Sequence, residues 1–562
     1  MNARFLFLII SLTSALSAVN PFNAKRTKFT QNSRLAEKIE QEILKQNSST
    51  NTNTNTTAAG NHAPVAAVSA SATEIIIGTT VIFNASSSSD PDGDTLTYTW
   101  DFNGDGVYET NSSSVASCFF TNRGTITVSV RVSDGSLSAT ASLVLTVKGP
   151  VVCSISNLSA TYSNMFSYPL AYGGNIYFRG KNTTGTYTIF KYATDAIRDV
   201  TVPASYINEF RHPCIHQGQI LFYGVKTGLI NWFFNLSNDT VTPLELSAGC
   251  HMGKANAHVP ASMDCYAAFD GFSNATTTIF SYIFSNNQVY NPPPTIDGFY
   301  KSGFLFPVKH GDGLYFRGER INGTDGVFVI VSNSIRSLTN VGSTYQSGFS
   351  ESIIWNGLLF FEALSTGNIL KPFYIYSNNY RYVNHVNDNI SSDYSNYFDN
   401  PIGLDDKIYF LGKSTTDVLT PFVIENKKVS RKITPASGGT YQYGFQHPVR
   451  FGNYIYFRGH NGSEYRVYCI KDDVIKDISS GTSDYNREFQ YGITTEHGVY
   501  FQGDNSSGKT LIYFLKDATI YQVSTNANYK NHYGDPCLFG DEIIFEGWDI
   551  NDVVRPFIVK FE

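Results

Sequence analysis

One spacing pattern returns nine times between Phe166 and the C-terminus, and it constrains the fold more than any other feature of this chain. Most repeats place a proline nine residues before a phenylalanine and a glycine two residues after it. The nine phenylalanines are Phe178, Phe222, Phe269, Phe316, Phe361, Phe410, Phe457, Phe501 and Phe545. They follow one another at intervals of about 44–49 residues. A fixed period of this length is typical of a solenoid, a propeller or another repeat array.

The composition indicates strands rather than helices. The chain has 562 residues with 41 Phe and 36 Tyr, but only 4 Met. Aromatic and β-branched residues favour strands, so we expect an all-β protein. Charged residues make up 16% and the net charge is −6. No basic surface is therefore expected, and nucleic acid is not an expected partner.

Each repeat has room for four short antiparallel strands. In the first repeat we expect strands at 168–172, 175–179, 187–192 and 196–200, joined by turns rich in Gly, Asn and Asp. Four such strands per unit are typical of a propeller blade. The ninth repeat ends at Glu562 before a fourth strand, whereas residues 151–155 precede the first complete repeat. We therefore expect residues 151–155 to complete the last blade and close a propeller over 150–562. Nine blades are expected, with eight kept open as the alternative.

The N-terminal region indicates export. Residues 1–18 combine Arg4, an apolar run and a small-residue zone, which is typical of a secretory signal peptide. Residues 19–62 are expected to form a tether, with an amphipathic helix at 33–45 and a disordered Asn/Thr-rich linker at 47–61. We find no second apolar run long enough to span a bilayer. The expected location is secreted, extracellular or at the cell surface.

Residues 63–149 are expected to form a separate β domain. Leu96, Tyr98, Trp100 and Phe102 alternate with polar residues, which is the period of a strand with one buried face. The segments DPDGD at 90–94, YTWDF at 98–102, GTITV at 124–128 and VSDG at 132–135 carry a resemblance to the PKD domain family. The resemblance implies an Ig-like β-sandwich that serves as a non-catalytic spacer or interaction module. Here the turn after Phe102 is longer than in the family, and Phe119 and Phe120 replace its usual Tyr.

The acidic turns of this domain are a candidate calcium site. Alternating oxygen ligands suit a hard cation, and the candidate ligands are Asp90, Asp92, Asp94, Asp101, Asn103 and Asp105. Ser112 stands where a calcium loop of the EF-hand type would need Glu. The alternative is simple turn chemistry, because tight turns use Asp, Asn and Gly. No other cofactor is expected.

Two further sets of residues are candidates for covalent modification. Cys250 and Cys265 could form a disulfide in an oxidising compartment, although small buried cysteines are the alternative. N-glycosylation sequons recur just after the second strand of several repeats, which predicts a glycoprotein if the source glycosylates them. These sequons are at Asn182, Asn274, Asn322, Asn461 and Asn505.

No catalytic motif is evident in the sequence. HExxH, GxSxG, Walker-type and CxxC patterns are missing from it. We therefore expect a non-enzymatic, exported structural or interaction protein of the adhesion type, with a protein or glycan partner and possible assembly into a larger surface structure. A carbohydrate-binding module is the first alternative. A polysaccharide lyase or hydrolase is the second, and it would require convergent carboxylates or a Tyr/His/Arg set.

Overall fold

A computed structural model describes residues 60–109, 113–228, 230–246, 250–251, 261–262, 267–273, 279–285, 288–290, 297, 299–332, 334–340, 345–377, 382–386, 393–478 and 484–562. The expected signal peptide, helix and linker lie outside these ranges, apart from the last residues of the tether. Within the described ranges the protein is all-β and contains no helix, which confirms the predicted fold class.

Two sheets form the N-terminal β domain. One has the order β1-β3-β5 and the other the order β2-β7-β6-β4. Their bounds are β1 (Ser69–Ala70), β2 (Glu74–Ile76), β3 (Thr79–Asn84), β4 (Thr97–Asp101), β5 (Val115–Phe120), β6 (Gly124–Ser133) and β7 (Ser138–Lys148). Trp100 on β4 is fully buried. Its ring lies 6.0 Å from that of Phe83 on β3. The aromatic residues of the two sheets therefore share one core.

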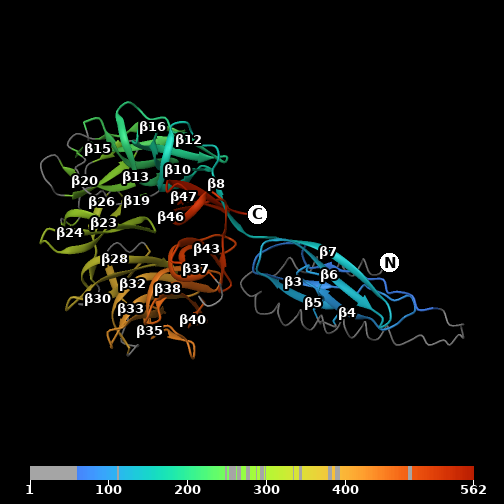
Figure 1. Cartoon of the computed structure of the whole chain (residues 1–562). Helices are drawn as coiled ribbons and strands as arrows, with labels where there is room; N and C mark the ends of the chain where they lie inside the picture. The colour runs from blue at the N-terminus through green and yellow to red at the C-terminus, as the bar shows by residue number, and fades with distance from the viewer. Residues whose placement is uncertain are drawn as a thin grey trace, which may run out of the picture. The chain divides into compact units, whose positions relative to one another are not determined.

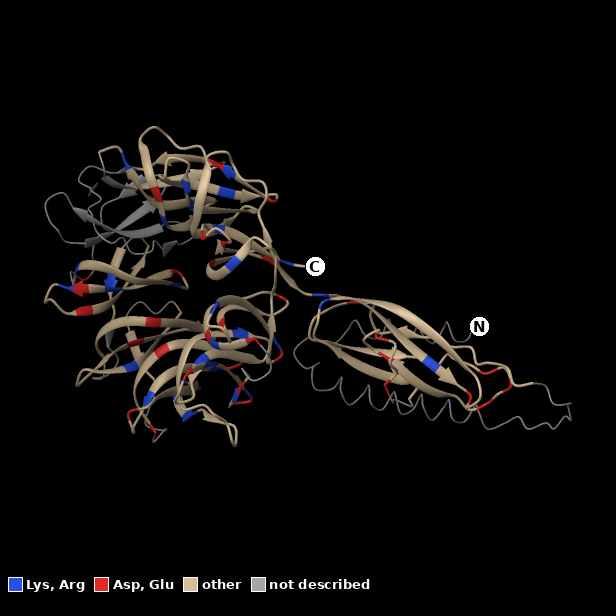
Figure 2. Ribbon diagram, viewed as in Figure 1, with Lys and Arg blue, Asp and Glu red and all other residues tan. Residues whose placement is uncertain are grey.

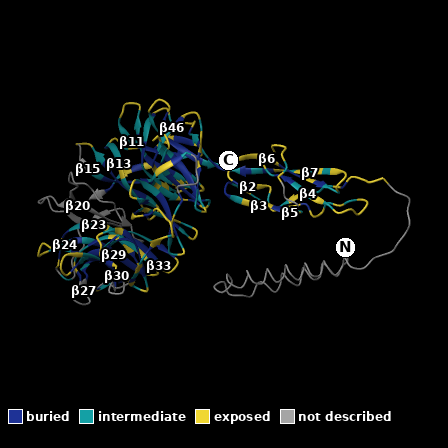
Figure 3. Ribbon diagram, turned by 60° about the horizontal axis from the view of Figure 1, so that its bottom comes forward, coloured by how far each residue is buried: buried dark blue, intermediate teal, exposed yellow. Residues whose placement is uncertain are grey.

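Within the described residues the repeats form nine sheets whose main strands pair antiparallel, and the first shows their pattern. Its strands are β9 (Tyr162–Tyr172), β10 (Asn175–Asn182), β11 (Tyr187–Ala193) and β12 (Ala196–Asp199), in the order β12-β11-β10-β9. The sheets with the same four-stranded arrangement confirm the expectation of four strands per repeat. Figure 1 shows these sheets following one another along the chain, and Figure 3 shows that their strands are largely buried while the turns are exposed.

The later units repeat this arrangement. Unit 2 comprises β13 (Tyr206–His216), β14 (Gln219–Lys226), β15 (Ile230–Ser237) and β16 (Thr240–Pro243). Unit 3 comprises β19 (Ala261–Ser262), β20 (Ala267–Ser273), β21 (Ile279–Ser285) and β22 (Gln288–Tyr290), with β17 (Glu245–Leu246) and β18 (Cys250–His251) added. Unit 4 comprises β23 (Tyr300–His310), β24 (Gly313–Arg320), β25 (Asp325–Val331) and β26 (Ser334–Ser337). Unit 5 comprises β28 (Tyr345–Trp355), β29 (Leu358–Ser365), β30 (Ile369–Tyr376) and β31 (Tyr382–His385), with β27 (Thr339–Asn340) added. Unit 6 comprises β32 (Tyr394–Leu404), β33 (Lys407–Ser414), β34 (Leu419–Glu425) and β35 (Lys428–Lys432). Unit 7 comprises β37 (Tyr443–Phe451), β38 (Tyr454–His460), β39 (Tyr465–Lys471) and β40 (Val474–Asp477), with β36 (Thr434–Pro435) added. Unit 8 comprises β41 (Tyr485–Thr494), β42 (Val499–Asn505), β43 (Thr510–Lys516) and β44 (Thr519–Gln522).

The ninth unit takes its fourth strand from the start of the repeat region. It consists of β46 (Tyr529–Phe539), β47 (Glu542–Asp549), β48 (Val554–Phe561) and β8 (Pro150–Ser154), with β45 (Ser524–Thr525) added. Strand β8 pairs antiparallel with β48, so that Val152 lies opposite Val559. The first strands of successive units contact one another, and β9 also contacts β46. The two ends of the repeat region are therefore hydrogen-bonded into one sheet.

The repeated phenylalanines form the centre of each unit. The eight whose side chains are described, from Phe178 to Phe545, are 0% exposed. The side chain of Phe269 lies outside the described residues. The following glycine makes room for two rings, because a Cβ on Gly180 would lie 2.7 Å from Phe190 and 3.0 Å from Tyr162. The spacing of Phe and Gly in the sequence therefore reflects aromatic packing.

In eight of the nine units a tyrosine at or just before the start of the first strand completes this packing, and the sequence analysis missed it. It stands at Tyr162, Tyr206, Tyr300, Tyr345, Tyr394, Tyr441, Tyr485 and Tyr529. In each case its hydroxyl donates a hydrogen bond to the carbonyl three residues later, for example from Tyr162 to Met165 at 2.8 Å. Met165 and its equivalents have positive φ. The tyrosine thus secures a left-handed turn of the backbone within the strand.

Candidate functional site on the first strands

In every unit except the third, the described first strand is longer than the strand it pairs with, and the extra residues are accommodated in bulges. Strand β9 has 11 residues and β10 has 8. The register shifts between the pairs Tyr177/Leu170 and Arg179/Ser167, and again further along. Bulges redirect side chains and are frequent next to functional sites. The bulged first strands are therefore the candidate location of a functional site in the repeats.

One bulge position is left-handed in every unit where it is described. It immediately precedes the repeated proline position and holds Tyr168, His212, Phe306, Glu351, Asn400, His447, Tyr491 and Asp535, here called the rim residues. None of them is glycine, although a left-handed conformation costs an L-residue energy. Backbone strain of this kind clusters at functional sites. The rim residues are therefore the strongest structural indication of a site in the repeats.

The rim residues present reactive and aromatic groups to solvent. Glu351, His447 and Asp535 are exposed. Phe306 and Tyr491 are 49% and 48% exposed, which is unusual for rings on strands.

The variable residue between the repeated Phe and Gly connects neighbouring units. Glu362 of unit 5 accepts a hydrogen bond from the backbone N–H of Phe398 in unit 6 at 2.9 Å. Gln502 of unit 8 accepts one from Tyr533 of unit 9 at 3.2 Å. These two contacts place the position between neighbouring units. We call it the connector position.

Glu546 makes the corresponding contact between the last unit and the first. Its carboxylate accepts a hydrogen bond from the backbone N–H of Phe166 at 3.3 Å. Arginines at the connector position act through ion pairs instead, as Arg179 does with Glu209 at 2.6 Å and Arg458 with Glu488 at 2.8 Å. All of these contacts cross from one unit to the next.

Three carboxyl groups converge between units 5 and 6. Glu351 lies within hydrogen-bonding reach of Asp399, and Glu362 lies close to both. Burial and the Asp399 carboxyl raise the pKa of Glu351. Burial raises the pKa of Glu362 to about 7, with Asp399 and Glu351 adding to the shift. Asp399 accepts hydrogen bonds from the Asn400 backbone N–H at 2.8 Å and from its Nδ2 at 3.0 Å.

The same positions between units 9 and 1 are surrounded differently. Burial raises the pKa of Glu546 to about 7, and Asp535 adds to the shift. Burial raises the pKa of Asp535, while His532 and Arg179 oppose that shift. His532 Nε2 lies 4.0 Å from the Glu546 carboxylate. Burial lowers the pKa of His532 and favours its neutral form, so Arg179 is the cation near Asp535 and Glu546, whereas Asp399 lies near Glu351 and Glu362. Figure 2 shows acidic and basic residues interspersed over the repeats.

The structure gives the predicted calcium ligands roles in turns. Asp101 accepts hydrogen bonds from the backbone N–H groups of Gly104 and Gly106 at 2.7 and 2.9 Å. Asn103 and Asp105 bond each other and the backbone that follows. No group of three or more His, Cys, Asp or Glu side chains within the described ranges could hold a metal ion. The residues therefore fit the turn alternative better than a calcium site.

The acids of the DPDGD segment also hold their own loop. Asp90 accepts hydrogen bonds from the backbone N–H groups of Asp92 and Asp94 at 2.8 and 3.2 Å. Asp92 accepts one from the His62 backbone N–H at 2.6 Å. These bonds again account for the acidic residues without a cation.

The predicted modification sites are only partly described. The Cys250 side chain, Cys265 and Asn274 lie outside the described residues. The Oδ1 of Asn182 accepts hydrogen bonds from the Thr184 backbone N–H and hydroxyl at 3.1 and 2.7 Å. Asn322, Asn461 and Asn505 accept similar bonds from the residues that follow them. The Asn-x-Ser/Thr spacing therefore also stabilises a hairpin turn, and glycosylation stays a prediction.

Comparison with known proteins identifies the N-terminal domain. Residues 61–148 match the family model of the PKD domain, which confirms the resemblance seen in the sequence. No curated protein matches the chain significantly. No helix within the described ranges has the length and apolarity needed to traverse a bilayer.

The solved structures that match the chain do so weakly. A puromycin-hydrolyzing peptidase of Mycobacterium tuberculosis is 9% identical, with a TM-score of 0.35, over 69% of this chain and 58% of that one. A prolyl endopeptidase is 10% identical, with a TM-score of 0.35, over 61% and 53%. A carbohydrate-binding module of the β-sandwich superfamily is 17% identical, with a TM-score of 0.17, over 33% and 80%. The chain thus spans less than two thirds of the peptidases that it matches.

These matches correct one expectation. A non-enzymatic adhesion protein was expected, but the solved structures that cover the repeats are peptidases, and the comparisons do not support an adhesion role. At these TM-scores the likeness assigns no activity to this chain.

Proposed function

We propose that the protein is a hydrolase of peptide bonds that uses Glu351 and Asp399 as an acid–base pair. The observation that carries this proposal is the convergence of these two carboxyl groups beside Glu362. Glu351 is a strained and exposed rim residue, so a substrate can reach it. A pair of carboxyl groups that shares one proton is the arrangement of acid peptidases.

The closeness of the pair also favours peptide over glycoside hydrolysis. Glycosidases keep their two carboxyl groups about 5–9.5 Å apart, because a sugar or a water molecule must fit between them. Glu351 and Asp399 are within hydrogen-bonding reach of each other. This geometry gives less support to the polysaccharide hydrolase that the sequence left open.

The reaction would proceed without a covalent intermediate. Asp399 takes a proton from a water molecule whose oxygen attacks the peptide carbonyl carbon, while Glu351 donates its proton to the carbonyl oxygen. The C–N bond of the tetrahedral intermediate then breaks and the amine leaves with a proton from Asp399. The hydroxyl proton returns to Glu351, which restores the shared proton.

The two Asn400 donors keep Asp399 in place during this cycle. The connector Glu362 is buried and bonded to the Phe398 backbone, so it acts as a positioning residue that fixes unit 6 against unit 5.

Cleavage of an unfolded protein substrate by the purified full chain at pH 4–6 tests this function. We expect Glu351→Gln and Asp399→Asn each to lower kcat by at least about 100-fold, the range of a lost acid or base. Asp535→Asn changes the equivalent rim acid of unit 9 and is the matched control, with unchanged kcat. Absence of cleavage by the wild-type protein, or full activity of Glu351→Gln, contradicts the proposal.

We further propose that the nine units close into a nine-bladed propeller, as the sequence predicts over 150–562. The pairing of β8 with β48 and the contact of β9 with β46 support closure. An experimental map of the full chain tests it. Nine units in an unbroken ring are expected, and eight blades or an open array would contradict the proposal.

We also propose export, with a signal peptide at 1–18, a tether at 19–62 and the PKD domain as a spacer over 63–149. The match to the PKD domain supports an extracellular setting. N-terminal sequencing of the protein secreted by its source should begin after Ala18. A mature chain that retains residues 1–18 contradicts this part of the proposal.

A further inference from the structure

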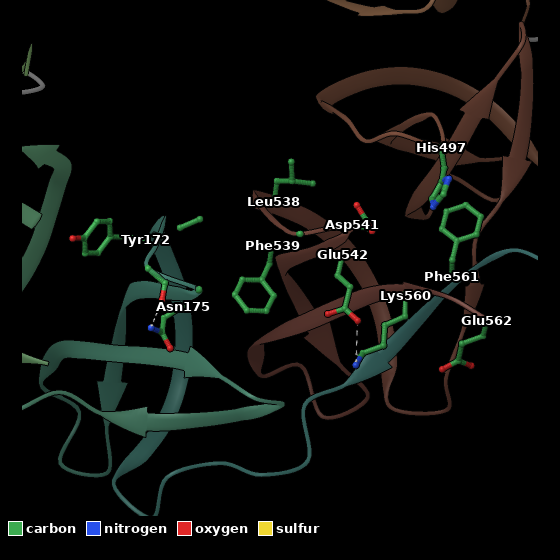
Figure 4. A pocket seen from close by; sticks show the side chains of 14 residues that line it. Tyr172, Asn175, His497, Leu538, Phe539, Asp541, Glu542, Lys560, Phe561 and Glu562 are labelled. Carbon is green, nitrogen blue, oxygen red and sulfur yellow. Dashed lines mark hydrogen bonds and ion pairs between the residues drawn. The ribbon is translucent and has the colours of Figure 1, made fainter. Parts of the chain in front are cut away.

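A cavity of about 820 Å³ opens where the hairpin turns of units 9 and 1 meet the tip of unit 8. Its lining includes residues 171–175 of unit 1, residues 538–542 and 560–562 at unit 9, and His497 of unit 8. Ligand sites in proteins commonly have volumes of about 300–1,000 Å³. Figure 4 shows the side chains around this space. None of them belongs to the proposed catalytic pair.

Aromatic rings form part of the wall. Tyr172, Phe539 and Phe561 line the cavity. The Phe561 ring lies 4.4 Å from that of His497, and Phe539 meets Tyr192 edge-on at 5.4 Å. These contacts hold the rings in place before a ligand arrives. The faces of aromatic rings attract organic cations.

The charge of the wall is negative. Asp541, Glu542 and Glu562 line the cavity, and Lys560 is its one lysine or arginine. Lys560 is already paired, with Glu542 at 3.4 Å and with Asp195 at 2.9 Å, and Figure 4 marks the first of these contacts. Asp541 is exposed and forms no hydrogen bond or ion pair with other residues in the described part of the chain. Carboxylates thus remain available to a cationic ligand.

From this wall we infer that the cavity binds a basic peptide segment, with a lysine or arginine side chain held between the aromatic rings and the carboxylates. Carboxylates would bond the cationic head, and the rings would cover its aliphatic stem. An acidic segment would be repelled by the excess negative charge. A neutral segment would leave Asp541 without a partner. The inference stands on this cavity alone and does not depend on the proposed hydrolysis.

Binding of a fluorescent Ac-(Lys)4-NH2 peptide to the full chain, at constant ionic strength, tests the inference. We expect binding that weakens at least fivefold when all four lysines are acetylated, because acetylation removes the charge. Asp541→Asn should weaken binding of the unmodified peptide at least threefold.

Asp406→Asn is the matched control variant. Asp406 occupies the same place in the hairpin turn of unit 6, between β32 and β33, and is equally exposed. Its loss changes the net charge by the same amount, so nonspecific attraction of a basic peptide falls equally in both variants. Equal binding of the acetylated peptide, equal effects of Asp541→Asn and Asp406→Asn, or no binding at all would each overturn the inference.

Discussion

Two interfaces between units, here called seams, share the same backbone contact and differ in their charged residues. One seam lies between units 5 and 6, and the other lies between units 9 and 1. In both, a connector glutamate accepts a hydrogen bond from the backbone N–H of the aromatic residue in the next unit. In both, burial raises the pKa of that glutamate to about 7. At the first seam the rim acid Glu351 meets the carboxyl of Asp399, whereas at the second Asp535 lies near His532 and Arg179.

The comparison shows that the repeated contacts fix how neighbouring units are placed, whereas the variable residues determine which charged groups meet at each seam. The connector contact recurs with Gln502 at a third seam, so it is part of the scaffold. The residues near the rim acid, which are Asp399 at the first seam and His532 and Arg179 at the second, account for the difference between the two seams. The proposed activity therefore belongs to one seam and not to the fold.

The largest expected effect tests whether the two seams share their framework. Phe361→Ala and Phe545→Ala each remove a ring that is 0% exposed. We expect each to lower the free energy of unfolding by about 3–5 kcal/mol, because a cavity replaces a large buried side chain. Chemical denaturation of both variants measures this loss. Values that differ by more than about 2 kcal/mol would show that the two units are not equivalent.

The next effect concerns the connector glutamates and pH. The pKa of a glutamate in an unfolded chain is about 4.3, whereas the pKa of Glu362 is about 7 in the folded protein. Between these values the folded chain holds a proton that the unfolded chain has lost. The stabilisation from protonated Glu362 is therefore complete below pH 4 and is lost as pH rises to 7.

Thermal unfolding at pH 5 and pH 8 measures this dependence. The loss for one such group is on the order of 2 kcal/mol. Glu362→Gln keeps the acceptor and mimics the natural Gln502, so this variant should be less sensitive to pH than the wild type. Glu546→Gln should behave alike at the other seam. A wild-type pH dependence in either variant would argue against the raised pKa.

The smallest expected effect lies at the outer edge of the units. Asp473 of unit 7 forms ion pairs with Lys407 and Arg431 of unit 6 and accepts a hydrogen bond from Tyr409. Asp239 of unit 2 contacts Lys191 and Tyr177 of unit 1 in the same way.

Asp473→Asn should therefore cost only about 1 kcal/mol, because partly exposed pairs contribute little. Its denaturation midpoint at 0.1 M and 1 M salt should shift less than that of the wild type. A loss as large as that of Phe361→Ala would mean that the outer contacts, rather than the aromatic cores, hold neighbouring units together.

The sequence predicted the framework well, because the framework repeats. The phenylalanine spacing identified the buried ring of each unit, and the missing last strand identified β8 as the strand paired with β48. Tyr162 and its equivalents were visible sixteen residues before eight of the nine phenylalanines. Their hydrogen bond could not be predicted, since it depends on the left-handed residue three positions later.

The candidate site could not be predicted from the sequence. Glu351 and Asp399 stand in different repeats and meet only because β28 and β32 lie side by side. The expected calcium ligands followed a local pattern, yet the structure uses their oxygens in turns. Local spacing thus identified turns and cores, whereas the convergent acids depend on how one unit is placed against the next.

The pH dependence of kcat/KM for peptide cleavage tests the central claim most directly. An acid pair that shares one proton predicts a bell-shaped profile with its maximum below pH 7, since activity needs one proton on the pair. Asp535→Asn should keep that profile, and Glu351→Gln should abolish cleavage across the whole range. A rate that rises steadily to pH 8, or a Glu351→Gln variant with the wild-type profile, would contradict the account.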